Sequence, residues 1–244
     1  MANAGSVDGG QEGFDVVAFG AHPDDVELSA GGTVARAVAA GKRVALVDLT
    51  RGELGTRGSA ELREREAAAA ADVLGVAHRE NCGLPDGAVG EDAESLSRVV
   101  EVIRRLKPAV VLANALSDRH PDHGRAAALV ARACFLAGLA RFEPGLAPWR
   151  PRLVLHYIQD RMRIPTVVVD ITGFEQAKYA AIAAYGSQFY TPDSAEPMTP
   201  ISSPAFLESL RGKDSVMGRY VGVQSGEGFE SERPLGIVDF DSLF

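Results

Sequence analysis

This chain of 244 residues has few cysteines, no long apolar run and no excess of positive charge, and each lack excludes a class of protein. Cys82 and Cys134 are too few for a disulfide framework and are interpreted as reduced packing residues. No uninterrupted apolar run approaches the ~18 residues that span a bilayer, and the first dozen residues lack the basic start and apolar centre of a signal peptide. We therefore expect no membrane contact and a cytoplasmic location.

The charge balance and the missing motifs narrow the function further. The formal charge of −8, from 33 acidic and 25 basic residues, argues against a protein that neutralises nucleic-acid phosphates. Neither the Gly-x-Gly-x-x-Gly fingerprint nor a Walker pattern occurs, so a nicotinamide-dependent oxidoreductase is only an alternative based on fold. No serine stands in a G-x-S-x-G context, so serine hydrolase chemistry is not indicated.

What the sequence does contain is an alternation of strands and helices. A hydrophobic content of 46% is enough for a sizeable core. Strands are expected at 14–19, 43–49, 77–81, 109–113, 152–158 and 166–169, and helices at 33–40, 59–74, 91–106, 122–139, 174–185 and 204–220. This alternation predicts an α/β fold, a Rossmann-like three-layer αβα sandwich with a mostly parallel sheet. Residues 1–13 are expected to form a flexible tail and 14–244 a single domain.

Two histidine clusters follow two of these strands, AHPDDVE at 21–27 and RHPDH at 119–123. With the strand order 3-2-1-4-5, both clusters lie at the carboxyl ends of neighbouring strands, at the topological switch point where ligands bind. His22 and Asp25 stand three residues apart and can project to one side, and His123 would complete three metal ligands. Three protein ligands and an open fourth position are typical of hydrolytic sites, so the sequence predicts a metal hydrolase.

The neighbouring residues supply candidate catalytic groups. Asp24 is predicted to be the general base. His120, held charged by Asp122, is predicted to stabilise an oxyanion and to protonate a leaving amine. This Asp–His pairing is a hypothesis that fails if the two side chains point to opposite sides of the loop. Arg63 is favoured as a contact to a substrate carboxylate, with Arg119 as a further candidate.

More ordinary interpretations of these residues exist. Either cluster alone is compatible with a turn that carries an Asx cap. However, three of the five histidines fall in the two clusters, and that concentration at two strand ends favours a site. His156 lies in an apolar strand pattern and is expected to be a core or rim residue, and His78 is expected to start a strand.

These two motifs resemble those of the LmbE-like, or PIG-L, family of zinc-dependent deacetylases that act on N-acetylglucosamine conjugates. The resemblance implies metal ligation by His22, Asp25 and His123, with Zn²⁺ as the cofactor and Fe²⁺ or another divalent metal as an alternative. It also implies a base at Asp24 and an oxyanion or acid role for His120 with Asp122, as the residues themselves suggest. The partners would be a small amino-sugar conjugate and further copies of the chain, as a trimer or hexamer.

Secondary motifs look most like those of the branch that makes bacillithiol, which removes acetate from N-acetylglucosaminyl malate. These motifs are ELR at 61–63, DRH at 118–120, YGSQF at 185–189 and EGF at 227–229. The resemblance implies that Arg63 contacts substrate and that the 192–206 loop borders the site. A malate conjugate carries two carboxylates, which arginines such as Arg63, Arg57 or Arg119 could clamp. One departure is Phe206, which stands where some relatives offer a tyrosine; Tyr190 is a possible substitute.

Other functions share parts of this pattern. A deacetylase of another amino-sugar conjugate, such as an inositol conjugate of the mycothiol type or a chitooligosaccharide, would use the same ligands. A non-catalytic sugar-binding protein would need neither Asp24 nor His120 beside an open metal position. Comparison of substrates distinguishes a deacetylase of another conjugate from one that acts on the malate conjugate. Release of acetate distinguishes an enzyme from a non-catalytic sugar-binding protein.

Overall fold

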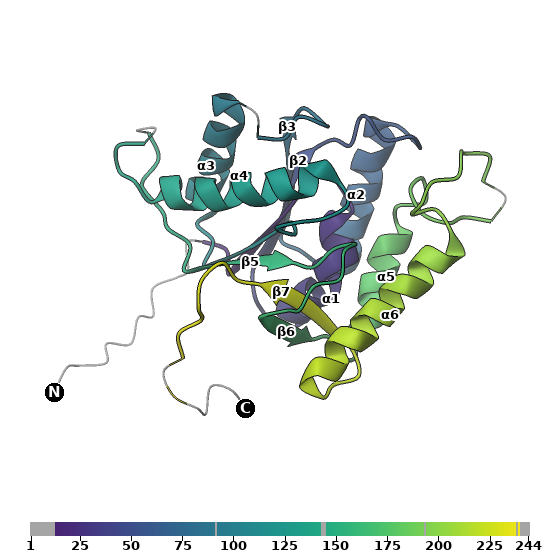
Figure 1. Ribbon diagram of the computed structural model, residues 1–244. Coiled ribbons are helices and arrows are strands. Elements are labelled where there is room, and N and C mark those ends of the chain that lie inside the picture. The colour runs from purple at the N-terminus through teal and green to yellow at the C-terminus, as the bar shows by residue number, and fades with distance from the viewer. Residues whose placement is uncertain (1–12, 91, 143–144, 193, 238, 240–244) are drawn as a thin grey trace.

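The computed structural model describes residues 13–90, 92–142, 145–192, 194–237 and 239, and within them a seven-stranded sheet forms the centre of the molecule (Figure 1). The strand order is β3-β2-β1-β4-β5-β7-β6. All described strands run parallel except β7, which is antiparallel to β5 and β6. The strands are β1 (Val16–Gly20), β2 (Val44–Thr50), β3 (His78–Leu84), β4 (Val110–Ala113), β5 (Leu153–Tyr157), β6 (Val167–Asp170) and β7 (Gly226–Glu230).

Helices cover both faces of this sheet, so the predicted three-layer α/β architecture is confirmed (Figure 1). The helices are α1 (Asp25–Ala39), α2 (Ala60–Leu74), α3 (Ala93–Leu106), α4 (Pro121–Ala137), α5 (Glu175–Ala183) and α6 (Pro204–Val221). Side chains alternate across each strand: Val17 and Phe19 pack in the core beneath α3 and α4, whereas Ala18 joins the core beneath α1, α2 and α5. A buried sheet with two apolar faces explains the continuous hydrophobic runs.

The order of the central strands places the two histidine motifs side by side. β1 pairs with β2 on one side and with β4 on the other. Strands β2 and β3 therefore lie on one side of β1, and the strands from β4 onward lie on the other side. The loop that follows β1 carries His22, and the segment that follows β4 leads to His120 and His123. Both loops leave the same edge of the sheet, at the switch point predicted from the sequence.

The largest difference from the sequence expectation is β7, which the glycine-rich pattern at 222–228 did not suggest. The glycines reflect close packing: a Cβ at Gly226 would come within 2.9 Å of the Gly218 nitrogen, and one at Gly228 within 2.8 Å of the Met217 sulfur. A second difference concerns α1, which begins at Asp25 inside the first motif rather than at 33. Pro23 has no backbone N–H to donate, but it precedes the helix, so it does not interrupt a helix that begins at Asp25.

The proposed N-terminal tail falls almost wholly outside the described residues. Residues 1–12 are not described, whereas Gly13, placed in the tail by the sequence, is buried and its carbonyl oxygen accepts a hydrogen bond from Arg43. Cys82 and Cys134 are buried and unpaired, as predicted. Among the described helices, none has both the length and the apolar content that crossing a bilayer requires.

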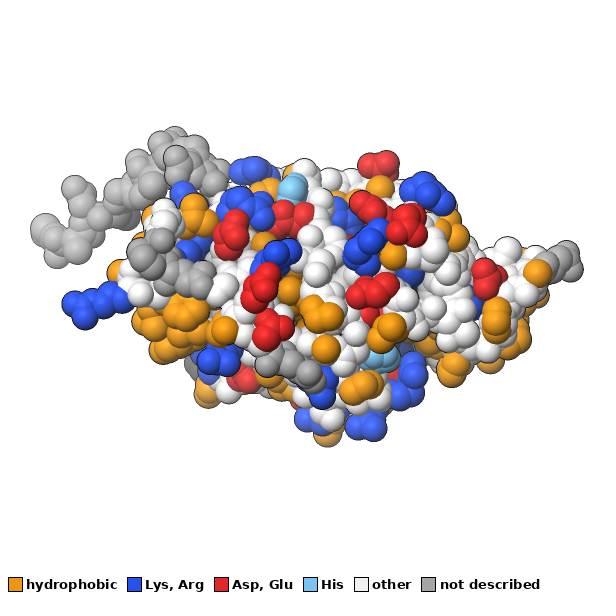
Figure 2. Space-filling view, turned by 90° about the horizontal axis from the view of Figure 1, so that it is seen from above, with side chains coloured by type: hydrophobic (Ala, Val, Ile, Leu, Met, Phe, Trp, Pro, Cys, Tyr) orange, Lys and Arg blue, Asp and Glu red, His pale blue; other side chains and the backbone are white. Residues whose placement is uncertain are grey.

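The molecular surface in Figure 2 intersperses basic and acidic side chains. On this face, Lys and Arg side chains do not merge into the continuous basic area with which proteins follow a nucleic-acid backbone.

Candidate metal and catalytic centre

The turn between β1 and α1 places the first motif tightly over the sheet edge. A side chain at Gly20 would come within 2.9 Å of the His22 carbonyl oxygen, so the turn requires glycine there. Asp24 follows with a positive φ of 112°, a left-handed conformation that non-glycine residues seldom adopt. Asp25 is the first residue of α1. The consecutive carboxylates therefore leave the chain in different backbone settings, and strain is concentrated at Asp24.

Asp25 is held by two amide side chains that the sequence analysis did not single out. Asn114, directly after β4, donates to Asp25 Oδ2 at 3.0 Å, and Gln159, shortly after β5, donates to Oδ1 at 2.9 Å. Asn114 also donates to Gln159 Oε1 at 3.1 Å, which ties the two amides together. Their signal in the sequence is position, because each follows an apolar strand whose carboxyl end faces the same edge.

His22 is surrounded by carboxylates. Its Nδ1 lies 3.6 Å from Asp25 Oδ2, and its Nε2 lies 3.1 Å from Asp86 Oδ1 and 3.5 Å from Asp122 Oδ2. Burial alone would lower the pKa of His22, but hydrogen bonds to Asp122, Asp25 and Asp86 raise it well above its ordinary value. Asp86, in the turn after β3, is a further site residue that the sequence analysis missed.

Carboxylates also contact both ring nitrogens of His123. Its Nε2 lies 3.1 Å from Asp25 Oδ1, and its Nδ1 lies 2.6 Å from Asp118 Oδ2. Burial opposes its protonation, yet the charge of Asp25 and the hydrogen bond to Asp118 raise the pKa of His123 to about 9. A carboxylate on the far nitrogen is how proteins orient a histidine that binds metal through its other nitrogen.

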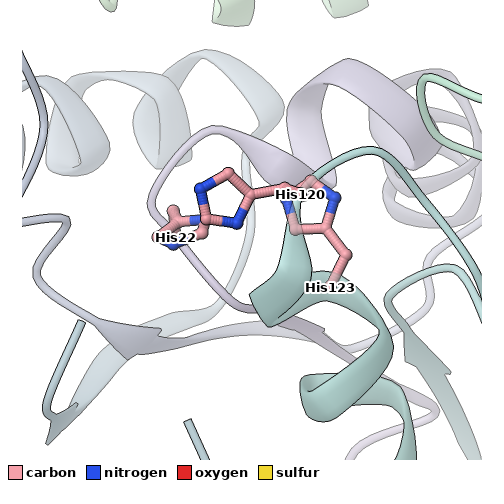
Figure 3. Close-up of side chains that lie close together, drawn as sticks. All are labelled: His22, His120 and His123. Carbon is pink, nitrogen blue, oxygen red and sulfur yellow. The ribbon is translucent and has the colours of Figure 1, made fainter. Parts of the chain in front are cut away.

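The three imidazoles lie together (Figure 3), with His120 and His123 at the start of α4 and His22 in the loop after β1. One ring nitrogen of each lies within 4.8 Å of the others, and His22, Asp86 and Asp122 form a second such group. Asp25 belongs to neither group, although it contacts both His22 and His123. The three predicted ligands, His22, Asp25 and His123, are thus in contact through Asp25. His120 lies close enough to His22 and His123 to be a further candidate ligand.

These donors fit a divalent cation. Imidazole nitrogens and carboxylate oxygens are ligands for zinc and for ferrous iron. The carboxylates of the described cluster raise the pKa values of His22 and His123, so that protonated rings balance the negative charge. A bound metal ion would supply that positive charge instead, and both rings would then be neutral ligands. The donor set is therefore consistent with a metal, and it does not fix which one.

Asp24 differs from Asp25 in its surroundings. Its Oδ2 accepts from Arg63 Nη2 at 3.0 Å, and the same nitrogen donates to the Pro23 carbonyl oxygen at 2.7 Å. Burial raises the pKa of Asp24 to about 7, partly offset by the Arg63 charge. By contrast, the charge of His123 overcomes burial and holds the pKa of Asp25 well below its usual range. Neighbouring carboxyl groups whose pKa values are shifted in opposite directions are typical of acid–base sites.

The structure corrects the predicted pairing of Asp122 with His120. The Asp122 carboxylate accepts from the Gly87 backbone nitrogen at 2.8 Å and faces His22. The contact with His120 is through the backbone instead, because Asp122 N donates to His120 Nδ1 at 3.3 Å, so that His120 is the N-cap of α4. Burial and the charges of His22 and His123 lower the pKa of His120, which favours the neutral ring, and acceptance at Nδ1 favours the tautomer with its proton on Nε2.

A cavity of about 580 Å³ opens beside this cluster. His22, Asp24, Asp25, His120 and His123 line it, and so do the predicted substrate contacts Arg63 and Arg119. The 192–206 segment contributes Thr199, Pro200, Ile201 and Phe206, which fits the expected border of the site. Phe206 stacks on Phe189 at the cavity wall, whereas Tyr190 is half exposed and does not line the cavity. Tyr190 is therefore not placed to substitute for the missing tyrosine.

Glu27, the last residue of the first motif, anchors α1 rather than lining the cavity. It is fully buried, and its Oε1 accepts from Arg79 and, at 2.9 Å, from the Tyr185 hydroxyl. Arg79 also donates to both oxygens of Asp48 on β2, at 2.8 Å each. The network fastens the first turn of α1 to β2, to β3 and to the segment just after α5.

Comparison with known proteins finds similarity over both histidine motifs. The sequence profile of the PIG-L family, described as GlcNAc-PI de-N-acetylase, matches residues 17–134. The chain is 31% identical to a 1D-myo-inositol 2-acetamido-2-deoxy-alpha-D-glucopyranoside deacetylase of Thermobispora bispora, over 77% of this chain and 72% of the relative. It is 32% identical to the 4-oxalmesaconate hydratase of Pseudomonas putida, over 69% and 71%. The structure of the conserved protein TT1542 from Thermus thermophilus superposes with a TM-score of 0.84 and 36% identity, over 93% and 98% of the two chains.

Proposed function

We propose, from the premise that this chain belongs to the PIG-L family, that it removes the N-acetyl group of an N-acetylglucosamine conjugate by metal-dependent hydrolysis. The observation that carries the proposal is the convergence of His22, Asp25 and His123 with Asp24 and His120 at one cavity. The arrangement combines candidate metal ligands, a carboxylate outside the ligand set and a neutral N–H donor, which are the parts that amide hydrolysis needs.

His22, Asp25 and His123 are the proposed metal ligands, and zinc is the proposed ion. Bound there, the metal would act as a Lewis acid and favour formation of the attacking hydroxide. Asp24 lines the cavity without belonging to this set and is proposed to take the proton of the attacking water. Arg63 holds the Asp24 carboxylate in place through its 3.0 Å ion pair.

His120 is proposed to donate from Nε2 to the oxygen on which negative charge develops. Its Nδ1 accepts from the backbone of Asp122, which fixes the neutral tautomer and leaves Nε2 as the donor. Asp122 is proposed to act through its position, because its backbone nitrogen orients His120 and its carboxylate faces His22. The proton that Asp24 receives would then pass to the leaving amine.

For the substrate, we propose N-acetylglucosaminyl malate, on the secondary motifs that resemble the bacillithiol branch. The relative from Thermobispora bispora is named for an inositol conjugate of the same acetylated sugar, so an inositol conjugate is the first alternative. A chitooligosaccharide is the second. Arg63 and Arg119 line the cavity and are proposed to contact the substrate.

The test is amine release by the zinc-loaded protein from N-acetylglucosaminyl malate, the inositol conjugate and free N-acetylglucosamine, with the metal-stripped protein beside it. Metal-dependent release with a preference for the malate conjugate is expected. Metal-dependent release with a preference for another conjugate would replace the substrate and keep the reaction. No release from any conjugate, with metal demonstrably bound, would overturn the proposal and favour a reaction such as the hydration named for the Pseudomonas putida relative.

A homo-oligomer, as a trimer or hexamer, and a cytoplasmic location are also proposed from the family resemblance. α4 offers a surface for association, because Phe135 is 58% exposed although its neighbour Cys134 is buried. Sedimentation equilibrium would measure the oligomeric state directly.

A further inference from the structure

Of the four cationic side chains that line the cavity, two face carboxylates and a third donates to backbone carbonyl oxygens. Arg63 faces Asp24, and Arg119 Nε donates to Asp160 at 2.7 Å. Lys213 donates to the backbone carbonyl oxygens of residues 158 and 159, at 3.2 and 3.1 Å. Each of these cations therefore already has an acceptor for its charged end.

Arg57 has one neutral hydrogen-bond partner and no carboxylate partner among the described residues. It is only 3% exposed, its Nη2 donates to the neutral Ser194 hydroxyl at 2.9 Å, and its Nε has no hydrogen-bond partner. Arg63 Nε also has none, but the Arg63 charge faces a carboxylate. Within the described part of the chain, no ion pair links Arg57 to an acidic side chain.

A buried guanidinium without a counter-ion is unfavourable, and buried charges in proteins are paired with each other or with a ligand. The acidic groups of the cavity are engaged elsewhere: Asp86 with His22 and Leu54, and Asp118 with His123. Among the described residues, the buried Arg57 guanidinium thus lies in the wall of the cavity that holds the proposed reaction centre, without a carboxylate partner.

We propose that Arg57 forms an anion subsite in this cavity and binds the carboxylate or phosphate group of an anionic amino-sugar conjugate. The inference rests on the proposed function and narrows its substrates to anionic ones. A planar guanidinium matches carboxylate and phosphate oxygens in a bidentate manner, and the unused Nε provides part of such an edge. The assignment differs from the sequence-based preference for Arg63, because the Arg63 charge is already directed to Asp24.

The kinetic test compares N-acetylglucosaminyl malate with its neutral dimethyl ester, for the wild type, Arg57→Gln and Arg57→Lys. Arg57→Gln is expected to lower the preference for the charged substrate about ten-fold or more, through KM, while activity on the ester changes little. Arg57→Lys is expected to retain part of the preference. Arg51→Gln is the matched control, because Arg51 lies in the same loop but is 44% exposed, pairs with Glu61 and does not line the cavity. An unchanged preference in Arg57→Gln would overturn the proposal.

Calorimetric binding to the metal-loaded protein separates this inference from the proposed reaction. N-acetylglucosamine 1-phosphate, N-acetylglucosaminyl malate and uncharged N-acetylglucosamine are compared, and the tighter of the two anions identifies phosphate or carboxylate as the group bound. Anion binding that Arg57→Gln abolishes, without any amine release, would support the subsite and refute the deacetylase. Deacetylation with no anion preference in the wild type would keep the reaction and overturn the subsite.

Discussion

At the scale of single residues, Asp24 carries the sharpest prediction. Asp24→Asn removes the proton acceptor but keeps the size of the side chain and a residue type that tolerates the left-handed backbone. We expect kcat to fall about 10²–10⁴-fold, as for loss of a general base, with metal content unchanged. Steady-state kinetics and elemental analysis measure the two effects. Asp25→Asn is the contrasting variant and should lose metal; an Asp24→Asn protein with normal kcat would disprove the base assignment.

The sequence identified residues by type and position but not by partner. His22, Asp25 and His123 meet as predicted because loops after neighbouring parallel strands must leave the same sheet edge. The direction of the Asp122 carboxylate was wrong, since a two-residue spacing does not specify whether the side chain or the backbone makes the contact with His120. Asn114 and Gln159 were missed because isolated amides form no motif, although both follow strands.

At the scale of elements, a buried carboxylate on β7 ties that strand to α1 and α5. Glu227 accepts from the backbone nitrogens of Gly32 and Thr33, at 3.0 and 2.7 Å, and lies 2.8 Å from Lys178 Nζ. Lys178 is fully buried, so Glu227→Gln is expected to cost about 3 kcal/mol of unfolding free energy, at the lower end for a broken buried pair because Asp214 remains.

Glu230→Gln is the control for this experiment because it lies on the same strand and breaks an ion pair with Arg163, whose side chain is 44% exposed. Its expected cost is at most about 1 kcal/mol. Urea unfolding of both variants measures the difference, and equal costs would mean that the Glu227 network does not stabilise the junction.

The same elements show where sequence patterns stop being informative. Both ends of α2 could be predicted from local sequence, because the Ser59 side chain accepts from Leu62 N and Gly75 adopts a left-handed conformation. β7 could not, because the pairing partners of an antiparallel strand inserted between β5 and β6 lie 56 to 74 residues away along the chain. Its glycines are selected by contacts with α6 rather than by turn geometry.

At the scale of the whole molecule, stability should depend on pH through Lys213. Burial and the nearby charge of Lys178 lower the pKa of Lys213 to about 8, against the attraction of Asp214, Glu227 and Asp118. The unfolded chain holds this proton up to its ordinary pKa of about 10.4, so the unfolded state binds more protons between pH 8 and 10.4. Through Lys213, stability is therefore fully present above this window and falls as pH decreases to 8.

Lys213→Met is accordingly expected to stabilise the protein at pH 7 by about 1–3 kcal/mol, and the gain should disappear as pH approaches 10.4. The difference between variant and wild type is the quantity to measure, by urea unfolding at several pH values. Burial raises the pKa of Cys82 and Cys134 to about 12, which makes both proteins less stable at high pH but cancels in the difference. Lys42→Met, with a side chain 56% exposed, should show no such trend. A Lys213→Met gain that stays constant from pH 7 to 10 would mean that Lys213 is protonated in the folded protein throughout this range.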